Sequence, residues 1–232
     1  MIKHYYYFGE RTGLSGNALS AQNWDTLRLN GDMNFALEEK GEWERKCLNN
    51  EFYRKKAEKV VESVDNELRN WISFGIGKGI LERNIVDIDS TISISGTDYA
   101  RETVDILIDY FAERAEVFCF DLLNYDEYDK LNEYEVAVMG RISTEFRMEQ
   151  WIRIFKELFK TTIKEIVFIP TEILSFCIAV RELFNHWSHI LLGKNDIMCG
   201  YMYTKREFER MFGPWRIRRF YDDDAMWVLC RE

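Results

Sequence analysis

The sequence predicts an α/β protein. We expect a three-layer sandwich on a mostly parallel, seven-stranded sheet that ends in an antiparallel hairpin, with a helical cap at the N-terminus. From residue 71 onward, short apolar segments alternate with amphipathic ones, the pattern of parallel strands joined by crossover helices. The last two strand-like segments, 216–223 and 225–232, are nearly contiguous. A crossover helix does not fit between them, so they are expected to pair as a hairpin.

Apolar residues spaced three to four positions apart predict the helices. In 36–69 the repeating residues are Phe52, Ala57, Val60, Val61 and Val64. In 98–115 they are Val104, Leu107, Ile108 and Phe111. Further helices are predicted at 147–162, 171–192 and 204–213, the last with Thr204 as its N-cap.

Short apolar segments between these helices predict the strands. They cover 71–74, 91–95, 116–121, 134–140 and 164–170, followed by the two hairpin strands. Each is too short for a helix of ordinary length, and turn-forming residues bound most of them. With the hairpin, these segments give the seven strands of the predicted sheet.

Composition limits the classes of partner. The chain has 232 residues, is 47% hydrophobic and carries a net charge of −9, with a pI of about 5.1. This composition supports a sizeable core and argues against disorder. The acidic balance disfavours nucleic acid as a partner, because that needs a concentrated basic face. Arg216, Arg218 and Arg219 form only a small basic cluster.

The sequence also predicts a soluble cytoplasmic protein with no membrane partner. Its five cysteines show no CxxC spacing, which is typical of reduced thiols. The first residues contain no apolar signal segment. The longest apolar stretch, 166–180, is interrupted by Pro170 and Glu172 and is too short to span a bilayer.

Three glycines at alternate positions, Gly75, Gly77 and Gly79, directly follow the first predicted strand of the sheet. Glycine is costly inside regular structure, so its repetition needs a reason. One is a sharp turn, and the other is a ligand that approaches the backbone closely. Ligands of such sheets bind at the carboxyl ends of the strands, beside a helix N-terminus, which favours the second reason.

Polar groups follow the next two strands as well. Asp98 ends the segment "ISGTD", about twenty residues after the glycines, where a carboxylate can accept hydrogen bonds from both hydroxyls of a ribose. Asp121 ends the next strand and can accept from an exocyclic amine, while the Leu122 N–H serves a ring nitrogen. Taken singly, Asp98 also suits a helix N-cap and Asp121 a turn. Three suitable strand ends in succession favour a nucleotide-like ligand.

At these positions the sequence resembles the class I S-adenosylmethionine-dependent methyltransferases. "ISFGIGKG" resembles their glycine-rich first motif, and "ISGTD" and "FDLL" resemble the motifs on their next two strands. "EYEVAVMG" and "TKREFERMFGPWRIRRF" are similar to their fourth strand and to the segment before their terminal hairpin. The resemblance runs from about residue 50 to the end. It divides the chain into a cap or lid at 1–49 and a methyltransferase-like domain at 50–232.

The resemblance implies S-adenosylmethionine as cofactor and methyl transfer to a small molecule. It implies cofactor contacts from Tyr53, Ser73, Gly75, Gly77, Gly79, Asp98, Tyr99, Asp121, Leu122 and Met139. The rival is a nicotinamide-binding fold, whose G-x-G-x-x-G motif would place its third glycine at Ile80. That rival does not predict the hairpin.

The sequence departs from the family pattern at two positions. Ser73 stands where the family usually has an acidic residue that helps to hold the cofactor's amino group, so another carboxylate would have to replace it. Glu135 stands where an Asp is usual. Two alternatives therefore stay open. One is a catalytically inert, cofactor-binding regulatory protein. The other is an aminobutanoyl transferase of the nicotianamine synthase type.

Candidate groups for the acceptor are few. His186 and His189 lie three residues apart on one face of a predicted helix, and His186 is the candidate general base; a packed pair without a catalytic role is the alternative. Arg141 is a candidate for binding an acidic substrate or, alternatively, an ordinary surface ion pair. No metal site is expected, since no HxH or H-E-x-x-H pattern is present.

Aromatic residues gather before the strand pattern begins: Tyr5, Tyr6, Tyr7, Trp24, Trp43 and Tyr53. One interpretation is that they pack the N-terminal segment onto the sheet. The other is that they form a lid over cofactor and acceptor, since aromatic faces attract cations and exclude water.

Overall fold

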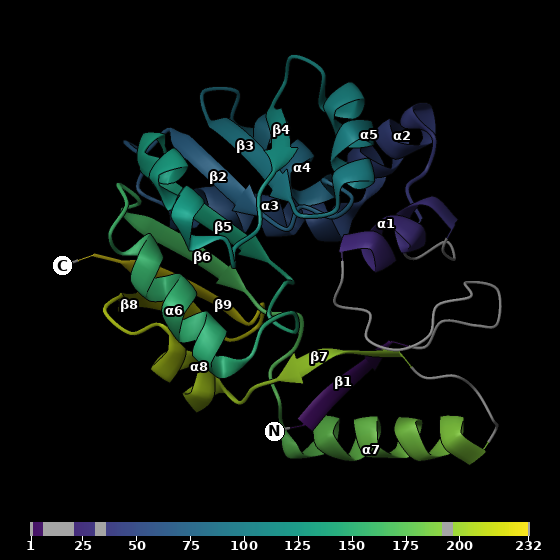
Figure 1. Cartoon of the computed structure of the whole chain (residues 1–232). Helices are drawn as coiled ribbons and strands as arrows, with labels where there is room; N and C mark the ends of the chain where they lie inside the picture. The colour runs from purple at the N-terminus through teal and green to yellow at the C-terminus, as the bar shows by residue number, and fades with distance from the viewer. Residues whose placement is uncertain (1, 7–20, 31–35, 192–196, 232) are drawn as a thin grey trace.

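A computed structural model describes residues 2–6, 21–30, 36–191 and 197–231 (Figure 1). Its main sheet has seven strands in the order β4-β3-β2-β5-β6-β9-β8. These strands are β2 Asn70–Phe74, β3 Ser93–Asp98, β4 Glu116–Cys119, β5 Val136–Gly140, β6 Glu165–Ile169, β8 Arg216–Tyr221 and β9 Met226–Cys230. The first five run parallel, and β9 is antiparallel to both of its neighbours, β6 and β8. The predicted sheet and hairpin are confirmed.

Helices cover both faces of this sheet. They are α2 Lys40–Asn49, α3 Glu51–Ser63, α4 Ile80–Ile88, α5 Arg101–Phe111, α6 Met148–Leu158 and α8 Lys205–Met211. Helix α7 Phe176–Leu191 lies apart from this sheet and contacts strand β1 Ile2–Tyr6 (Figure 1). Strand β5 shows the two layers: Val136 and Val138 pack with α3 and α4, whereas Ala137 and Met139 pack with α6 and α8. Alternation of this kind is required of a strand buried on both faces. The three-layer sandwich is therefore confirmed.

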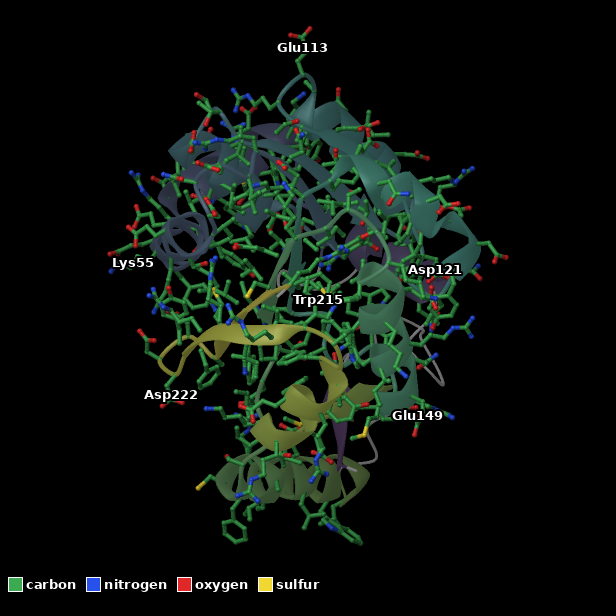
Figure 2. All side chains as sticks on the ribbon, turned by 90° about the vertical axis from the view of Figure 1, so that its left-hand side faces the viewer. Lys55, Glu113, Asp121, Glu149, Trp215 and Asp222 are labelled. Atoms are coloured by element: carbon green, nitrogen blue, oxygen red, sulfur yellow. The ribbon has the colours of Figure 1, made fainter. Side chains whose placement is uncertain are left out.

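Aromatic side chains fill the layer under α6 and α8. Trp215 is 4% exposed, and its indole N–H donates to the Phe155 carbonyl at 2.9 Å. Figure 2 shows Trp215 inside the molecule, while Lys55 and Glu113 project from its surface. A buried tryptophan needs such an acceptor, because an unpaired indole N–H is costly in the core.

Several boundaries differ from the expectation. The helix predicted at 36–69 is two helices, because the Asn50 side chain accepts from the Tyr53 N–H at 3.2 Å and starts α3 as a new helix. The strand predicted at 91–95 runs from Ser93 to Asp98, so Asp98 is its last residue. Thr204 is an N-cap as predicted, with Glu207 completing a capping box.

No range was predicted for five of the described elements. They are β1 Ile2–Tyr6, α1 Ala21–Asn30, α4 Ile80–Ile88, a 3₁₀ helix at Tyr125–Glu133 and β7 Ile197–Met202. β1 pairs antiparallel with β7 in a separate two-stranded ribbon, and α1 lies near α5 (Figure 1). Among the described residues, no helix is long and apolar enough to cross a membrane.

The described residues before position 50 thus lie in three separate parts of the structure. β1 joins the ribbon, α1 lies beside α5, and α2 belongs to the core. Trp43 on α2 is fully buried, with its ring 5.3 Å from that of Phe111 and its N–H donating to the Lys78 carbonyl at 2.7 Å. Tyr5 and Tyr6 lie on β1, but their side chains, like all of Tyr7, are outside the described residues.

Candidate functional site

The glycine-rich loop follows β2 at the point where the strand order reverses. Gly75, Gly77 and Gly79 have φ angles of 67°, 56° and 68°, which L-residues with side chains rarely adopt. A Cβ atom on Gly75 would lie 2.3 Å from Cγ2 of Ile142. The glycines therefore make a sharp turn. Gly75 and Gly77 also line the cavity described next, while the second reason, a ligand close to the backbone, stays a prediction.

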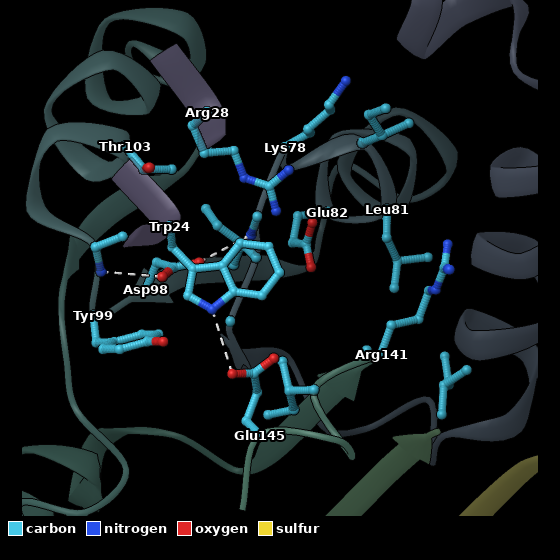
Figure 3. A pocket seen from close by; sticks show the side chains of 18 of the residues that line it. Trp24, Arg28, Lys78, Leu81, Glu82, Asp98, Tyr99, Thr103, Arg141 and Glu145 are labelled. Atoms are coloured by element: carbon cyan, nitrogen blue, oxygen red, sulfur yellow. Dashed lines mark hydrogen bonds between the residues drawn. The ribbon is translucent and has the colours of Figure 1, made fainter. Parts of the chain in front are cut away.

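A cavity of about 450 Å³ lies over this loop (Figure 3). Its walls come from α1, α3, the glycine loop, the end of β3 and the loop after β5. The residues that line it include Trp24, Arg28, Tyr53, Lys56, Gly75, Gly77, Glu82, Asp98, Tyr99, Arg141 and Glu145. This is the position at which open α/β sheets bind their ligands.

Asp98 braces the loop from the neighbouring strand. Its Oδ2 accepts from the Gly77 N–H at 3.1 Å, and its Oδ1 accepts from the Ala100 N–H at 3.1 Å. The side chain is almost fully buried, and burial raises its pKa above the ordinary value in spite of these hydrogen bonds. Asp98 is thus both a structural brace and a carboxyl group at the cavity wall.

Glu82 on α4 places an acidic group beside Ser73. The Ser73 hydroxyl donates to Oε1 of Glu82 at 2.6 Å. Glu82 is 3% exposed and lines the cavity, and its Oε2 has no hydrogen-bond partner among the described residues. Burial raises the pKa of Glu82 to about 7, and the charge of Asp98 adds to the effect. A carboxyl group therefore lies next to Ser73 with one buried oxygen that accepts no hydrogen bond from the described residues.

Glu145 lies in the loop after β5 and accepts from the Trp24 indole N–H at 3.4 Å (Figure 3). Burial of its carboxyl group raises its pKa to about 8, with a further contribution from the charge of Asp98. Together with Glu82 and Asp98, it makes three cavity carboxyls with raised pKa values. Such a group favours a cationic ligand, because a positive charge compensates for the carboxylates' burial.

Helix α1 closes the cavity from above. Oδ1 of Asp25 accepts from both the N–H and the hydroxyl of Thr103, at 2.8 and 3.0 Å. It caps the first turn of α5, whose own N-cap residue, Ala100, makes no side-chain hydrogen bond. Arg28 reaches the glycine loop, with its Nη2 atom 2.8 Å from the place of a Cβ on Gly77.

Positive side chains gather at another part of the cavity wall. Arg141 has a φ of 63°, and two hydrogen bonds hold its backbone there. The Arg141 N–H donates to the Ile169 carbonyl at 2.7 Å, and the Thr171 hydroxyl donates to the Arg141 carbonyl at 2.8 Å. Its guanidinium donates to the Tyr53 hydroxyl at 3.3 Å. Burial lowers the pKa of nearby Lys56, and the charge of Arg141 lowers it further. These two cations suit an anionic group.

A second cavity of about 340 Å³ adjoins the first and shares Gly75, Tyr99, Ile142 and Glu145 with it. The rest of its lining is mainly apolar: Phe120, Asp121, Leu122, Leu123, Phe146, Arg147, Gln150 and Tyr201. Asp121 is exposed, and its Oδ1 accepts from the Leu123 N–H at 2.8 Å. A flat ring with an exocyclic amine fits this chemistry.

Most of the predicted site residues are brought together. Lining one or both cavities are Tyr53, Gly75, Gly77, Asp98, Tyr99, Asp121, Leu122 and Arg141. Ser73, Gly79 and Met139 lie behind the walls instead. The side chains of His186 and His189 are outside the described residues, and their helix, α7, contributes no described residue to either cavity.

Sequence reasoning missed Arg28, Lys56, Glu82 and Glu145. Glu82 had a usable signal, since an acidic residue in the first turn after the last glycine can return to the loop. The other three had no such signal. Arg28 lies on α1, which was not predicted; Lys56 reaches the cavity only through the packing of α3; and Glu145 lies in an irregular loop.

Comparison with known proteins shows which solved structures share this fold. No family model and no curated protein matches the sequence. Among similar solved structures, human N-acetylserotonin methyltransferase in complex with S-adenosylmethionine is 14% identical, with a TM-score of 0.58 over 92% of this chain and 57% of that chain. PigF with S-adenosylhomocysteine is 16% identical, with a TM-score of 0.56 over 79% of this chain and 56% of that chain.

An O-methyltransferase family 2 protein from Planctomyces limnophilus, in complex with apigenin, is 12% identical, with a TM-score of 0.57 over 90% of this chain and 65% of that chain. This chain spans little more than half the length of the first two proteins. The likeness is one of architecture, and it agrees with the strand order and the terminal hairpin. The chain has the fold of the class I S-adenosylmethionine-dependent methyltransferases.

Proposed function

We propose that this chain binds S-adenosylmethionine and transfers its methyl group to a small-molecule acceptor. The observation that carries the proposal is a set of three carboxyl groups around a glycine loop at the strand ends: the buried Asp98 and Glu82 and the half-buried Glu145. The cofactor brings two positive charges, on sulfur and on its amino group. A cavity with raised carboxyl pKa values stabilises such a ligand more than a neutral one.

Each part of the cavity receives one part of the cofactor in this proposal. The second cavity holds the adenine between Tyr99 and Leu122, with Asp121 accepting from its amine. Asp98 accepts from the ribose hydroxyls, and the free oxygen of Glu82 accepts from the amino group. Lys56 and Arg141 receive an anionic group, either the cofactor's carboxylate or an acidic acceptor. Cofactor binding to Arg141→Ala separates these two roles.

When bound, the cofactor would supply an activated methyl group: the acceptor's lone pair would attack that carbon in line with the carbon–sulfur bond, and S-adenosylhomocysteine would leave with the electrons of that bond. Much of the rate then comes from alignment, which the loop and strand ends provide. The acceptor must also lose a proton. We assign its removal to Glu145, which borders both cavities and whose pKa lies near working pH. Glu145→Gln should lower kcat and remove the alkaline rise of the pH–rate profile.

We propose that helix α1 acts as a lid over the cavity. Trp24 and Arg28 contact the cavity directly, whereas Trp43 on α2 is a core residue. We therefore propose that the lid is narrower than residues 1–49 and consists of α1. An aromatic face over the cleft attracts a sulfonium and excludes water from the reaction.

Calorimetry and product analysis test this function. We expect micromolar-scale binding of S-adenosylmethionine and none of a nicotinamide dinucleotide; the reverse result would overturn the proposal. Incubation with small phenols, beginning with apigenin, should yield S-adenosylhomocysteine. Methylthioadenosine would indicate aminobutanoyl transfer instead, and binding without any product from a broad acceptor panel would indicate a regulatory protein.

A further inference from the structure

Helix α7 carries a row of large apolar side chains that face solvent. They are Phe176, Val180, Leu183, Phe184, Trp187 and Leu191, exposed by 83%, 50%, 58%, 72%, 57% and 82%. We call this set the α7 stripe. Four of its members, at positions 176, 180, 183 and 187, are spaced four, three and four residues apart. That spacing forms a single seam along a helix, the pattern by which one helix packs against another.

The polarity of α7 is reversed relative to an ordinary surface helix. Among its described side chains, the buried one is Glu182, at 3% exposure. Glu182 pairs with Arg181 at 3.0 Å, and Arg181 also pairs with Glu172 before the helix. The charged side chains of α7, Arg181 and Glu182, are thus held by the chain itself, while the apolar side chains of the stripe point outward. A large exposed apolar patch of this kind marks a surface that another surface covers.

We propose that the α7 stripe is the interface with a second copy of this chain. A fully exposed aromatic side chain offers roughly 150–250 Å². By that measure the stripe presents on the order of 800 Å² per copy, about what each partner contributes to a stable interface. A seam that pairs with its own symmetry mate around a two-fold axis needs no other complementary surface. The proposal does not depend on the enzymatic activity.

Charge favours a second copy over a lipid surface. Helices that lie on membranes carry Lys and Arg on their polar face to attract anionic headgroups. The described part of α7 has one such residue, Arg181, and two carboxylates already engage it. The stripe itself is uncharged, so it offers nothing to an anionic headgroup and can pack against the same stripe of a second copy.

Sedimentation velocity on the full chain tests the interface. We expect a species of twice the 27.8 kDa chain mass that dissociates on dilution. Leu183→Glu, at the centre of the stripe, should raise the dimer dissociation constant at least tenfold. Phe176→Glu, at the exposed start of the helix, is a second variant in case the first does not fold, which circular dichroism will show. Ile108→Glu is the control, because Ile108 is 49% exposed on α5, away from the stripe.

The dimer proposal fails if the wild-type chain is a monomer at high concentration, or if both stripe variants fold and still dimerise like the control. If the wild-type chain co-sediments with phosphatidylglycerol vesicles and Leu183→Glu does not, the stripe binds a lipid surface and the dimer proposal is wrong. Loss of the dimer in the stripe variants alone, without vesicle binding, supports the proposal.

Discussion

The strand ends and helix α1 face each other across the same cleft, yet different forces hold them in place. The strand-end wall, consisting of the glycine loop, Asp98 and Asp121, continues directly from a sheet buried on both faces. The cap wall, consisting of α1, is anchored by the Asp25–Thr103 hydrogen bonds and reaches the cleft through Trp24 and Arg28. A rigid wall fixes where a ligand sits, and a loosely held one allows it to enter. The predictions below test that difference.

The largest effect is expected at Gly75 in the strand-end wall. Gly75→Val combines a strained positive φ with a contact of 2.3 Å to Ile142, so it should destabilise the fold by about 2–5 kcal/mol and abolish cofactor binding. Thermal unfolding and calorimetry measure both effects. Gly41→Ala is the control, because nothing lies within 4 Å of its added Cβ. A stable Gly75→Val protein with normal binding would show that the wall is not rigid.

Asp98→Ala should have the next largest effect. It removes a hydrogen-bonding carboxyl from the cavity and the brace on the Gly77 N–H, so cofactor binding should weaken by about 1.5–3 kcal/mol. Asp121→Ala should weaken it by about 1 kcal/mol, since Asp121 is exposed. An analogue without the adenine amine should lose less on Asp121→Ala than the natural ligand. Equal losses would remove Asp121 from the adenine site.

Glu82 predicts a dependence on pH. Its pKa rises from the ordinary 4.5 to about 7 on folding, so its contribution to stability is complete below pH 4.5 and is lost as the pH rises through 7. A bound cation should reverse this shift, so cofactor binding near pH 7 should release protons. Calorimetry in buffers of different ionisation enthalpy measures that release.

The Glu82→Gln variant should release fewer protons and bind the cofactor more weakly than wild type. Glu102→Gln is the matched control, because Glu102 is an exposed carboxyl on α5 outside both cavities. If Glu82→Gln releases as many protons as wild type, another group releases them. Glu145 would then be the candidate, because its pKa is also raised.

The smallest effect is expected in the cap wall. Asp25→Ala removes the cap of α5 and the anchor of α1, which should cost about 1 kcal/mol. By hydrogen exchange, α1 should open faster than α2 without ligand, and cofactor should slow it markedly. In Asp25→Ala that protection should fall, whereas Gln22→Ala, an exposed change on α1, should leave it intact. Exchange in α1 as slow as in α2, with or without ligand, would mean that α1 is core and not a lid.

The sequence predicted the strand-end wall well because its signals are local. Glycines with positive φ and carboxylates directly after apolar strands occupy fixed places in such a sheet. The cap wall was visible only as a cluster of aromatic residues. Trp24 and Trp43 look alike in sequence, but one lines the cavity and the other is fully buried, a difference that only tertiary packing decides. A truncation before residue 45 would therefore remove the buried Trp43 as well as α1.

The hydrogen bond between Ser73 and Glu82 also bears on how function is traced between distant proteins. A carboxyl group that the sequence pattern places at position 73 is offered here from α4, nine residues later in the chain. A column-by-column alignment would score the motif as lost, although the oxygen lies beside the same strand. The reciprocal exchange, Ser73→Asp together with Glu82→Ser, would return the acid to its usual column. If that double variant binds the cofactor as wild type does and each single change does not, the two positions act as one functional unit.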